Sequence, residues 1–410
     1  MPSDDRVWWL ADESDAHELI VEYVRAVEEQ QRYQHELDVR NAQLYSNRNV
    51  VATGWDSRGG GVGGVHNFAR VSQNVIQSVV DTATSMIARV RPKATFQTDG
   101  ADFSTQRRAK MLDQFCVGLF QKTDIYDKSV TTFRDSCVYG TGALHVYTDK
   151  NEICVERVMP GELIADEIEC ASAPPMQIHR RRFVSRERLK NYYPQFKDKI
   201  ELARPVDTSQ QYTSWRRLDP QITPIIESWH LPSEPGGDDG RHSIVIEGAA
   251  LLWEEYDKDH FPLIIERWTD PLVGFYGQGL AEQLTGIQLR INKLNRFIVE
   301  AQDLIAVPRV FTDVASKALK AQLTDKIGQV IGYRGRPPIF MTAQAVGPEI
   351  YEYLERLKAS AFEFAGISQL SAQSKKPAGL ESAVALREYN DINTERFAIQ
   401  AQRHEKTFLT

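Results

Sequence analysis

The sequence predicts an α+β fold in which helices and an antiparallel sheet form the first two thirds of the chain, and long helices form most of the rest. Apolar residues recur at helical spacing before residue 140. Short alternating segments, bounded by turn residues, predict strands between residues 143 and 268. Beyond residue 280, a regular 3.5-residue period predicts long packed helices. The 410 residues are enough for two or three hydrophobic cores.

The first two thirds of the chain divide into predicted helices followed by predicted strands. Helices are expected at 15–46, 68–90, 103–122 and 125–138, with a further short helix at 186–192. The glycine run Gly59–Gly64 is interpreted as a flexible loop. Strands are expected at 143–148, 153–158, 177–184, 223–231, 242–247, 250–256 and 262–268.

From Asp270 the chain is expected to be almost wholly helical. The strict apolar period from Leu280 to Ile305 predicts a helix about 40 Å long, and a helix that begins at Pro348 repeats this spacing. A last helix is expected from about Leu380 and is still periodic where the sequence stops, which indicates a chain that stops inside a helix. An isolated helical hairpin cannot bury both stripes, so lateral packing in an oligomer is expected. The stripe residues are Leu284, Ile287, Ile291, Leu294, Ile298, Leu354 and Leu357.

Composition and charge argue against several functional classes. No apolar run approaches the ~20 residues that span a bilayer, and no signal-peptide pattern opens the sequence, so no membrane partner is expected. The net charge of −7 lies in residues 1–30, which hold nine acidic and two basic residues. The neutral remainder is unlike a DNA-binding protein with a basic patch. The four cysteines are widely spaced, so neither a disulfide framework nor a zinc site is expected.

One glycine motif invites comparison with nucleotide-binding loops. Gly274, Gly277 and Gly279 follow a predicted strand and precede a helix, but their order is the reverse of the dinucleotide fingerprint. No lysine follows, and no βαβ unit surrounds them. We interpret the motif as a hinge at the start of the long helix, with nucleotide binding as the alternative.

Other polar clusters give little support to catalysis. The carboxylates of Asp166, Glu167 and Glu169 suit a metal or acid–base site, but no histidine cluster accompanies them, so a solvated turn is preferred. The basic run His179–Arg182 lies on a predicted strand and is interpreted as a charged rim or subunit interface. No nucleophile motif is found. The protein is therefore expected not to be an enzyme and to need no cofactor.

The order of these elements resembles that of the portal proteins of tailed bacteriophages, the head-to-tail connectors. The resemblance is clearest in the segments 271–280, 366–368 and 376–387. Shorter segments in the N-terminal half are similar as well, at 81–87, 91–93, 139–142 and 156–160. The resemblance covers about residues 60–410 and rests on the joint order of the motifs.

The resemblance implies a ring, usually of about twelve subunits, at one capsid vertex of the virion. Double-stranded DNA would pass through it during packaging and ejection. By position, the resemblance implies a helix-rich wing (1–268), a first stem helix (269–305), a small α/β clip (306–347), a second stem helix (348–366), a channel loop (367–380) and a helix towards a crown that is absent or truncated (381–410). The implied partners are further copies of the chain, DNA in transit, the terminase large subunit, head-completion or tail-adaptor proteins, and the major capsid and scaffolding proteins. Assembly would take place in the host cytoplasm.

Three groups of residues are expected to serve this function. Channel-loop residues expected to touch DNA are Ser368, Gln369, Ser371, Gln373, Ser374, Lys375 and Lys376, the alternative being a surface linker. Stem residues expected to face the channel are Arg290, Lys293, Asn295 and Arg296. Clip residues expected to dock partners, unless they are merely a solvated basic surface, are Arg309, Lys317, Lys320, Lys326, Arg334 and Arg336. The competing hypotheses are a coiled-coil scaffold or adaptor without a DNA channel, and an enzyme with a helical accessory domain.

Overall fold

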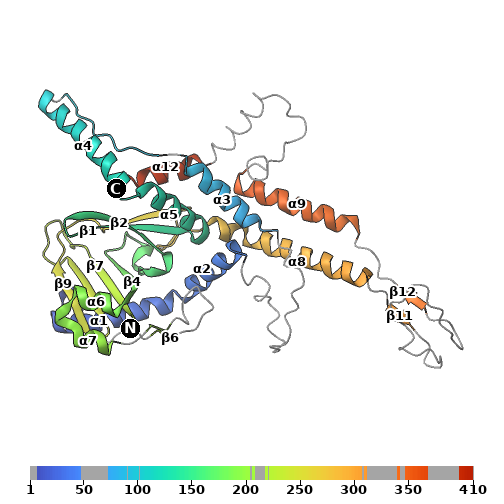
Figure 1. Ribbon diagram of the computed structural model, residues 1–410, viewed down its shortest axis with the longest axis horizontal. Helices are drawn as coiled ribbons and strands as arrows, with labels where there is room; N and C mark the ends of the chain where they lie inside the picture. The colour runs from blue at the N-terminus through green and yellow to red at the C-terminus, as the bar shows by residue number, and fades with distance from the viewer. Residues whose placement is uncertain are drawn as a thin grey trace.

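The computed structural model describes residues 7–47, 73–89, 91–100, 102–203, 206–207, 218–219, 221–306, 309–311, 339–341, 347–367 and 397–409. These residues form a mixed helix-and-sheet protein with antiparallel sheets, which confirms the general α+β class. Figure 1 shows an α+β body, a helix that projects from it at the upper left, and a long helical projection on the opposite side.

Most helices begin and end within two residues of the predicted positions, whereas α3, predicted at 68–90, begins after its cap at Asn74 and ends at Ile87. The helices are α1 (Glu13–Gln30), α2 (Arg32–Tyr45), α3 (Val75–Ile87), α4 (Phe103–Lys122), α5 (Ile125–Tyr139), α6 (Arg186–Tyr192), α7 (Lys197–Leu202), α8 (Leu280–Ala306), α9 (Pro348–Ala365) and α12 (Ala398–Lys406). Short 3-10 turns are η1 (Trp8–Leu10), η2 (Pro160–Glu162), η3 (Glu169–Ala171) and η4 (Pro194–Phe196). Helix α7 was not predicted from the sequence.

Two antiparallel sheets build the body. The three-stranded sheet has the order β10-β1-β2 and the five-stranded sheet the order β3-β4-β7-β8-β9. All predicted strands are confirmed to within two residues. The strands are β1 (Thr141–Asp149), β2 (Glu152–Val158), β3 (Leu163–Ile164), β4 (Gln177–Ser185), β5 (Val206–Asp207), β6 (Leu218–Asp219), β7 (Ile222–His230), β8 (Arg241–Ile246), β9 (Ala249–Glu255), β10 (Leu263–Arg267), β11 (Arg309–Phe311) and β12 (Ile339–Met341).

The predicted single helix 15–46 is in fact two helices that meet at Gln31. The apolar period runs across this position, so the sequence does not reveal the break. At the break, the Gln31 amide donates a hydrogen bond to the carbonyl oxygen of Ala165, and the Tyr276 hydroxyl donates one to Gln31 Oε1 over 3.3 Å. The change in direction lets α1 pack on the five-stranded sheet while α2 packs on α5 and α8.

The basic run on β4 makes ion pairs within the chain, and its Arg180 is buried and so does not lie on the expected charged rim or subunit interface. The side chain of Arg180 is only 1% exposed and donates to Glu162 Oε2 over 2.9 Å. Arg181 pairs with Glu28, and Arg182 lies 3.4 Å from Glu227. Arg180 pairs with acidic residues inside the body, because a charge removed from water requires a partner of opposite sign, whereas Arg181 and Arg182 make ion pairs while partly exposed.

The C-terminal helix also differs from its prediction. Helix α12 ends at Lys406 instead of continuing through the last described residues, and residues 381–396 lie outside the description. Beyond it, Phe408 turns back onto the body, where its ring centroid lies 5.8 Å from that of Phe120 and 5.7 Å from that of Tyr126. This aromatic contact holds the end of the described chain against α4 and α5.

Candidate assembly and channel interface

The α8–α9 pair forms the long projection. Helix α8 spans about 40 Å at 1.5 Å per residue, and α9 returns alongside it (Figure 1). At the far end, β11 pairs antiparallel with β12, with Val310 opposite Phe340. This two-stranded sheet is the described part of the predicted clip. The two long helices that the sequence predicted are therefore present, with a short antiparallel sheet at their far end.

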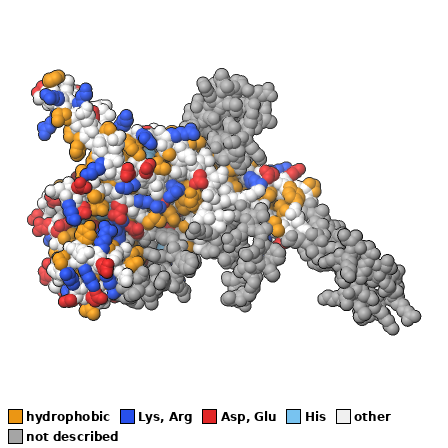
Figure 2. All heavy atoms as spheres, viewed as in Figure 1, with side chains coloured by type: hydrophobic (Ala, Val, Ile, Leu, Met, Phe, Trp, Pro, Cys, Tyr) orange, Lys and Arg blue, Asp and Glu red, His pale blue; other side chains and the backbone are white. Residues whose placement is uncertain are grey.

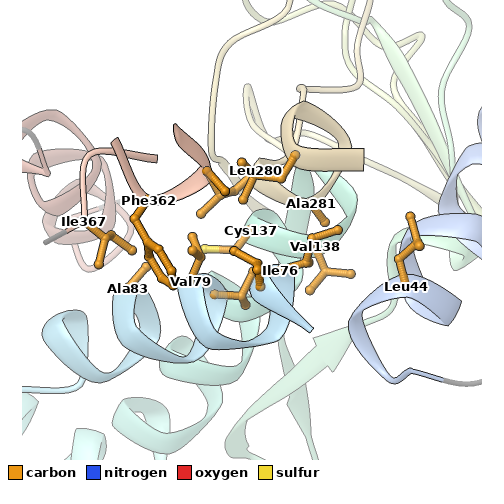
Figure 3. Close-up of a cluster of buried hydrophobic side chains, with 14 of the residues drawn as sticks. Leu44, Ile76, Val79, Ala83, Cys137, Val138, Leu280, Ala281, Phe362 and Ile367 are labelled. Atoms are coloured by element: carbon orange, nitrogen blue, oxygen red, sulfur yellow. The ribbon is translucent and has the colours of Figure 1, made fainter. Parts of the chain in front are cut away.

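The apolar stripes of α8 and α9 are buried within one chain. Leu284, Ile291, Ile298 and Leu354 belong to the largest core cluster, and Ile287, Leu294 and Leu357 pack against it. Helix α3 completes this core with side chains that include Val79 and Ala83, next to Cys137 and Val138 of α5 (Figure 3). The expectation that these stripes need a neighbouring copy is therefore wrong, because α3 supplies the missing surface.

A second set of apolar side chains lies on the outside of the same two helices. These residues are 41–60% exposed, and Figure 2 shows hydrophobic side chains at the surface of this part of the projection. They are Leu289, Phe297, Tyr351, Tyr353 and Phe364. Exposed clusters of large apolar side chains mark interaction surfaces. The heptad pattern missed four of them because they fall between its stripe positions. Phe364 lies on the predicted stripe of α9 but is 60% exposed.

Three of the four predicted channel-facing residues are exposed. Arg290, Lys293 and Arg296 follow one another at three-residue intervals on α8. The Arg290 guanidinium lies 5.7 Å from the centroid of the Tyr353 ring, and Arg296 Nε is 2.7 Å from Glu300 Oε1. These bases lie beside the exposed apolar side chains, so the outer face of α8 is both apolar and positively charged.

Asn295 is a correction to the predicted channel face. It is only 7% exposed, because it shares the inner face of α8 with Ile291 and Ile298. Its Nδ2 atom has no hydrogen-bond partner among the described residues. A side chain at this position packs against the chain's own core and cannot reach DNA in a channel.

Gln288 also lies on the inner face, where it joins α8 to α3. Its Oε1 atom accepts hydrogen bonds from the backbone N–H groups of Val75 and Ile76, at 2.8 and 3.3 Å. Its Nε2 atom donates to the carbonyl oxygen of Gln73 over 2.9 Å. The first N–H groups of a helix have no partner within that helix. One side chain of α8 therefore caps the start of α3.

The glycine motif at the start of α8 packs against a second glycine motif far away in sequence. A Cβ atom on Gly140 would lie 1.9 Å from the carbonyl oxygen of Gly277, and Gly140 has a φ of +92°. Gly277 N–H donates to Thr141 Oγ1 over 2.9 Å, and a Cβ atom on Gly279 would lie 2.7 Å from Gly140 N. Protein backbone therefore covers the glycine surface that a phosphate would need. This close backbone contact supports a structural role for the glycines at the start of α8 over nucleotide binding.

The C-terminal helix fixes the base of the projection. Arg403 donates to the carbonyl oxygen of Trp268 over 2.7 Å and lies 2.6 Å from Asp270 Oδ2. Beside it, His404 Nδ1 is 2.8 Å from Glu266 Oε1, and both residues are at most 3% exposed. Burial raises the pKa of Glu266, and His404 partly offsets this. The segment that connects β10 to α8 is thus held against α12, which follows α9 in the sequence.

A buried carboxylate lies where α2 meets α8. Asp38 is 4% exposed and accepts a hydrogen bond from Gln34 Nε2 over 3.1 Å. Burial raises the pKa of Asp38 to about 7, against an ordinary 3.8; the Gln34 hydrogen bond opposes this rise, and the charge of Glu282 on α8 adds to it. The base of the projection therefore contains an acid that titrates near neutral pH.

The carboxylates of Asp166, Glu167 and Glu169 do not form a joint site. The Tyr23 hydroxyl donates to Asp166 over 3.1 Å. The backbone N–H groups of Phe275 and Met176 donate to Glu167 and Glu169, over 2.9 and 2.6 Å respectively. Each acid thus holds a different segment, and all three lie partly exposed in or beside a turn, in agreement with the preferred turn interpretation. Across the described ranges, no group of three metal-ligating side chains is found.

Most of the remaining predicted site residues lie outside the described part of the chain. This holds for all seven channel-loop residues and for the clip residues Lys317, Lys320, Lys326, Arg334 and Arg336, whereas Arg309 begins β11. Within the described residues, no helix has the length and hydrophobicity to cross a bilayer. No protein-family model matches this sequence, and no curated protein matches it either.

Proposed function

We propose that this protein is a portal protein that forms a ring at one capsid vertex and conducts double-stranded DNA. The observation that carries the proposal is the outer face of the α8–α9 pair. Large apolar side chains such as Leu289, Phe297 and Tyr353 stay exposed there, although most of the inner stripe of each helix is already buried. A single chain leaves this face in water, whereas neighbours in a ring would cover it.

The other parts of the chain take roles by position. The α+β body is the wing, the α8–α9 pair is the stem, and the segment around β11 and β12 is the clip. The bases Arg290, Lys293 and Arg296 border the apolar side chains of this face, and their long side chains extend beyond the covered area to DNA phosphates. Such contacts do not read sequence, because phosphate contacts carry no base information. The partners are DNA, the terminase large subunit, tail adaptors, and capsid and scaffolding proteins, and the ring assembles in the host cytoplasm.

The size and shape of the purified protein test the ring. We expect light scattering to give the mass of about twelve chains and end-on negative-stain images to show a closed ring with an axial hole. The double variant Leu289→Glu/Phe297→Glu should lose the ring but keep its fold, because both side chains are exposed. Gln302→Glu, at another exposed position of α8, is the control and should assemble normally.

Two outcomes contradict this function. An unaltered chain that stays monomeric at all concentrations refutes the ring. A rod-shaped oligomer without an axial hole supports the coiled-coil scaffold instead. Ile291→Asp is unsuitable as an assembly test, because Ile291 is fully buried within the subunit and its replacement would unfold the core.

The channel loop and the clip are tested in virions and by binding assays. Lys375→Glu/Lys376→Glu should leave rings intact but reduce the DNA packaged or retained per particle. Unchanged genome length, retention and packaging rate would remove the loop from the proposal. Arg334→Glu/Arg336→Glu should weaken binding of terminase or adaptor to preformed rings, and unaltered binding would show that these bases are a solvated surface.

A further inference from the structure

Helix α4 projects from the body with almost no support of its own (Figure 1). None of its residues is buried, although it is 20 residues long. Several of its large apolar side chains are 39–80% exposed, namely Phe103, Met111, Leu112, Phe115 and Val117. An isolated helix is marginal in water unless tertiary contacts cover its apolar side. Helix α4 therefore presents an apolar face for which the described chain has no partner.

The exposed face of α4 is also basic. Met111 and Phe115 are one turn apart and form an apolar stripe, and Arg107 and Arg108 precede it on the same helix. Lys110 adds a third exposed positive charge. Within the described residues, none of these three bases has an acidic partner. A surface of this kind fits a partner whose complementary surface is acidic.

Helix α1 presents the opposite charge on a different side of the body. Its inner face, which includes Ile20 and Val24, packs on the five-stranded sheet. Its outer face carries Glu18, Glu22 and Glu29, which are exposed and have no cationic partner in the described ranges. Figure 1 shows α1 along the lower edge of the body, well separated from α4 at the upper left. The two helices therefore do not meet within one chain.

We propose that α4 of one subunit packs on the outer face of α1 of the next subunit in the ring. This inference rests on the proposed function, and it names the contact that joins neighbouring wings. A cyclic ring is built from heterologous contacts, in which one patch meets a different patch on the next copy. Two surfaces of opposite charge, on separate sides of one chain, meet this requirement. The partner of α4 is thus a second copy of this chain.

Charge reversal on α4 is the first half of the test. In this variant every contact between α4 and α1 of the next subunit brings acidic residues together, so assembly should require at least tenfold more protein at ~0.1 M salt. The effect should shrink at ~1 M salt, where the screening length falls to about 3 Å. The substitutions are Arg107→Glu, Arg108→Glu and Lys110→Glu. The helix should still form, because all three residues are exposed, and circular dichroism checks this.

Charge reversal on α1 is the second half. Glu18→Lys, Glu22→Lys and Glu29→Lys together should weaken assembly as strongly as the α4 variant does. Mixing the two variants in equal amounts should restore rings, because each altered α4 then meets an altered α1 and each unaltered α4 meets an unaltered α1. Such rings alternate, so native mass spectrometry should find equal numbers of the two chains and an even total.

A matched control reverses three exposed bases elsewhere in the body, with Arg188→Glu, Lys197→Glu and Lys199→Glu. It should assemble like the unaltered protein. If the α4 variant also does so, the inference is overturned while the proposed ring stands. Loss of assembly that mixing does not restore overturns α1 as the partner. Charge-dependent binding of α4 to anionic vesicles or to DNA, with assembly unchanged, assigns the helix to those partners instead. An unaltered chain that forms no ring refutes both the inference and the function.

Discussion

Replacing Asp38 with asparagine should stabilise the protein strongly at alkaline pH and by much less at pH 5. Asp38 is 4% exposed, and its hydrogen bond from the neutral Gln34 side chain supplies no positive charge. Burial therefore raises its pKa to about 7 in the folded protein, against an ordinary 3.8. A raised pKa means that the folded state holds the proton more tightly than the unfolded state. The stabilising effect is complete below about pH 4 and is lost as the pH rises through 7.

The size of the effect follows from the two pKa values. Each pKa unit corresponds to about 1.4 kcal/mol, so ionised Asp38 destabilises the folded state by about 4 kcal/mol above pH 8, relative to its protonated form. An asparagine side chain at this position carries no charge at any of these pH values and avoids this penalty. The free energy of unfolding should therefore differ by about 4 kcal/mol in favour of Asp38→Asn at pH 9, and by only about 1.5–2 kcal/mol at pH 5, where the carboxyl is protonated in the folded state and largely ionised in the unfolded state.

Urea denaturation followed by tryptophan fluorescence, at pH 5, 7 and 9, measures this difference. Glu36→Gln is the control, because Glu36 lies on the same helix but has 68% of its side chain exposed. Its effect should stay within about 0.5 kcal/mol at every pH. A pH-independent gain for Asp38→Asn, or a loss at pH 9, would refute the conclusion that a buried carboxylate without a counter-charge lies at the base of the projection.

Two further predictions concern the same region and use the same denaturation assay. Gly140→Ala should destabilise by about 3 kcal/mol or more, because its Cβ would overlap the Gly277 carbonyl at a positive φ, whereas Gly118→Ala on the open surface of α4 should stabilise slightly. His404→Ala should cost about 3–5 kcal/mol by leaving the buried Glu266 carboxylate unpaired. Adding Glu266→Gln to that variant should recover part of the loss, and no recovery would show that packing, not charge, is responsible.

Local sequence patterns predicted the elements of the fold well. The sequence pattern located every described strand of five or more residues, and the 3.5-residue period located α8 and α9. These signals depend on which face of an element is apolar. The same patterns missed the break at Gln31. The groups that hydrogen-bond to the broken segment are the Tyr276 hydroxyl and the backbone of Ala165, which no local pattern contains.

The candidate site was predicted less completely than the fold. The two long helices were predicted, but Asn295 was placed on the wrong face because polar character alone does not show which residues a neighbouring helix covers. The exposed residues Leu289 and Phe297 were overlooked because apolar character alone does not show which residues remain exposed after the chain has folded. A periodic apolar stripe indicates which side chains a helix buries within its own chain. The side chains that remain exposed, and so can contact another molecule, are known only from the tertiary structure.

The sequence by itself determined the class of fold, the order of its elements and the position of the long helices, since each is encoded by spacing along the chain. Only the tertiary structure decided what those helices pack against. Helix α3 buries the stripes that seemed to need another subunit, and Gly140 meets Gly277 across a gap of more than a hundred residues. Such contacts depend on how distant segments approach one another, and no local period records that approach.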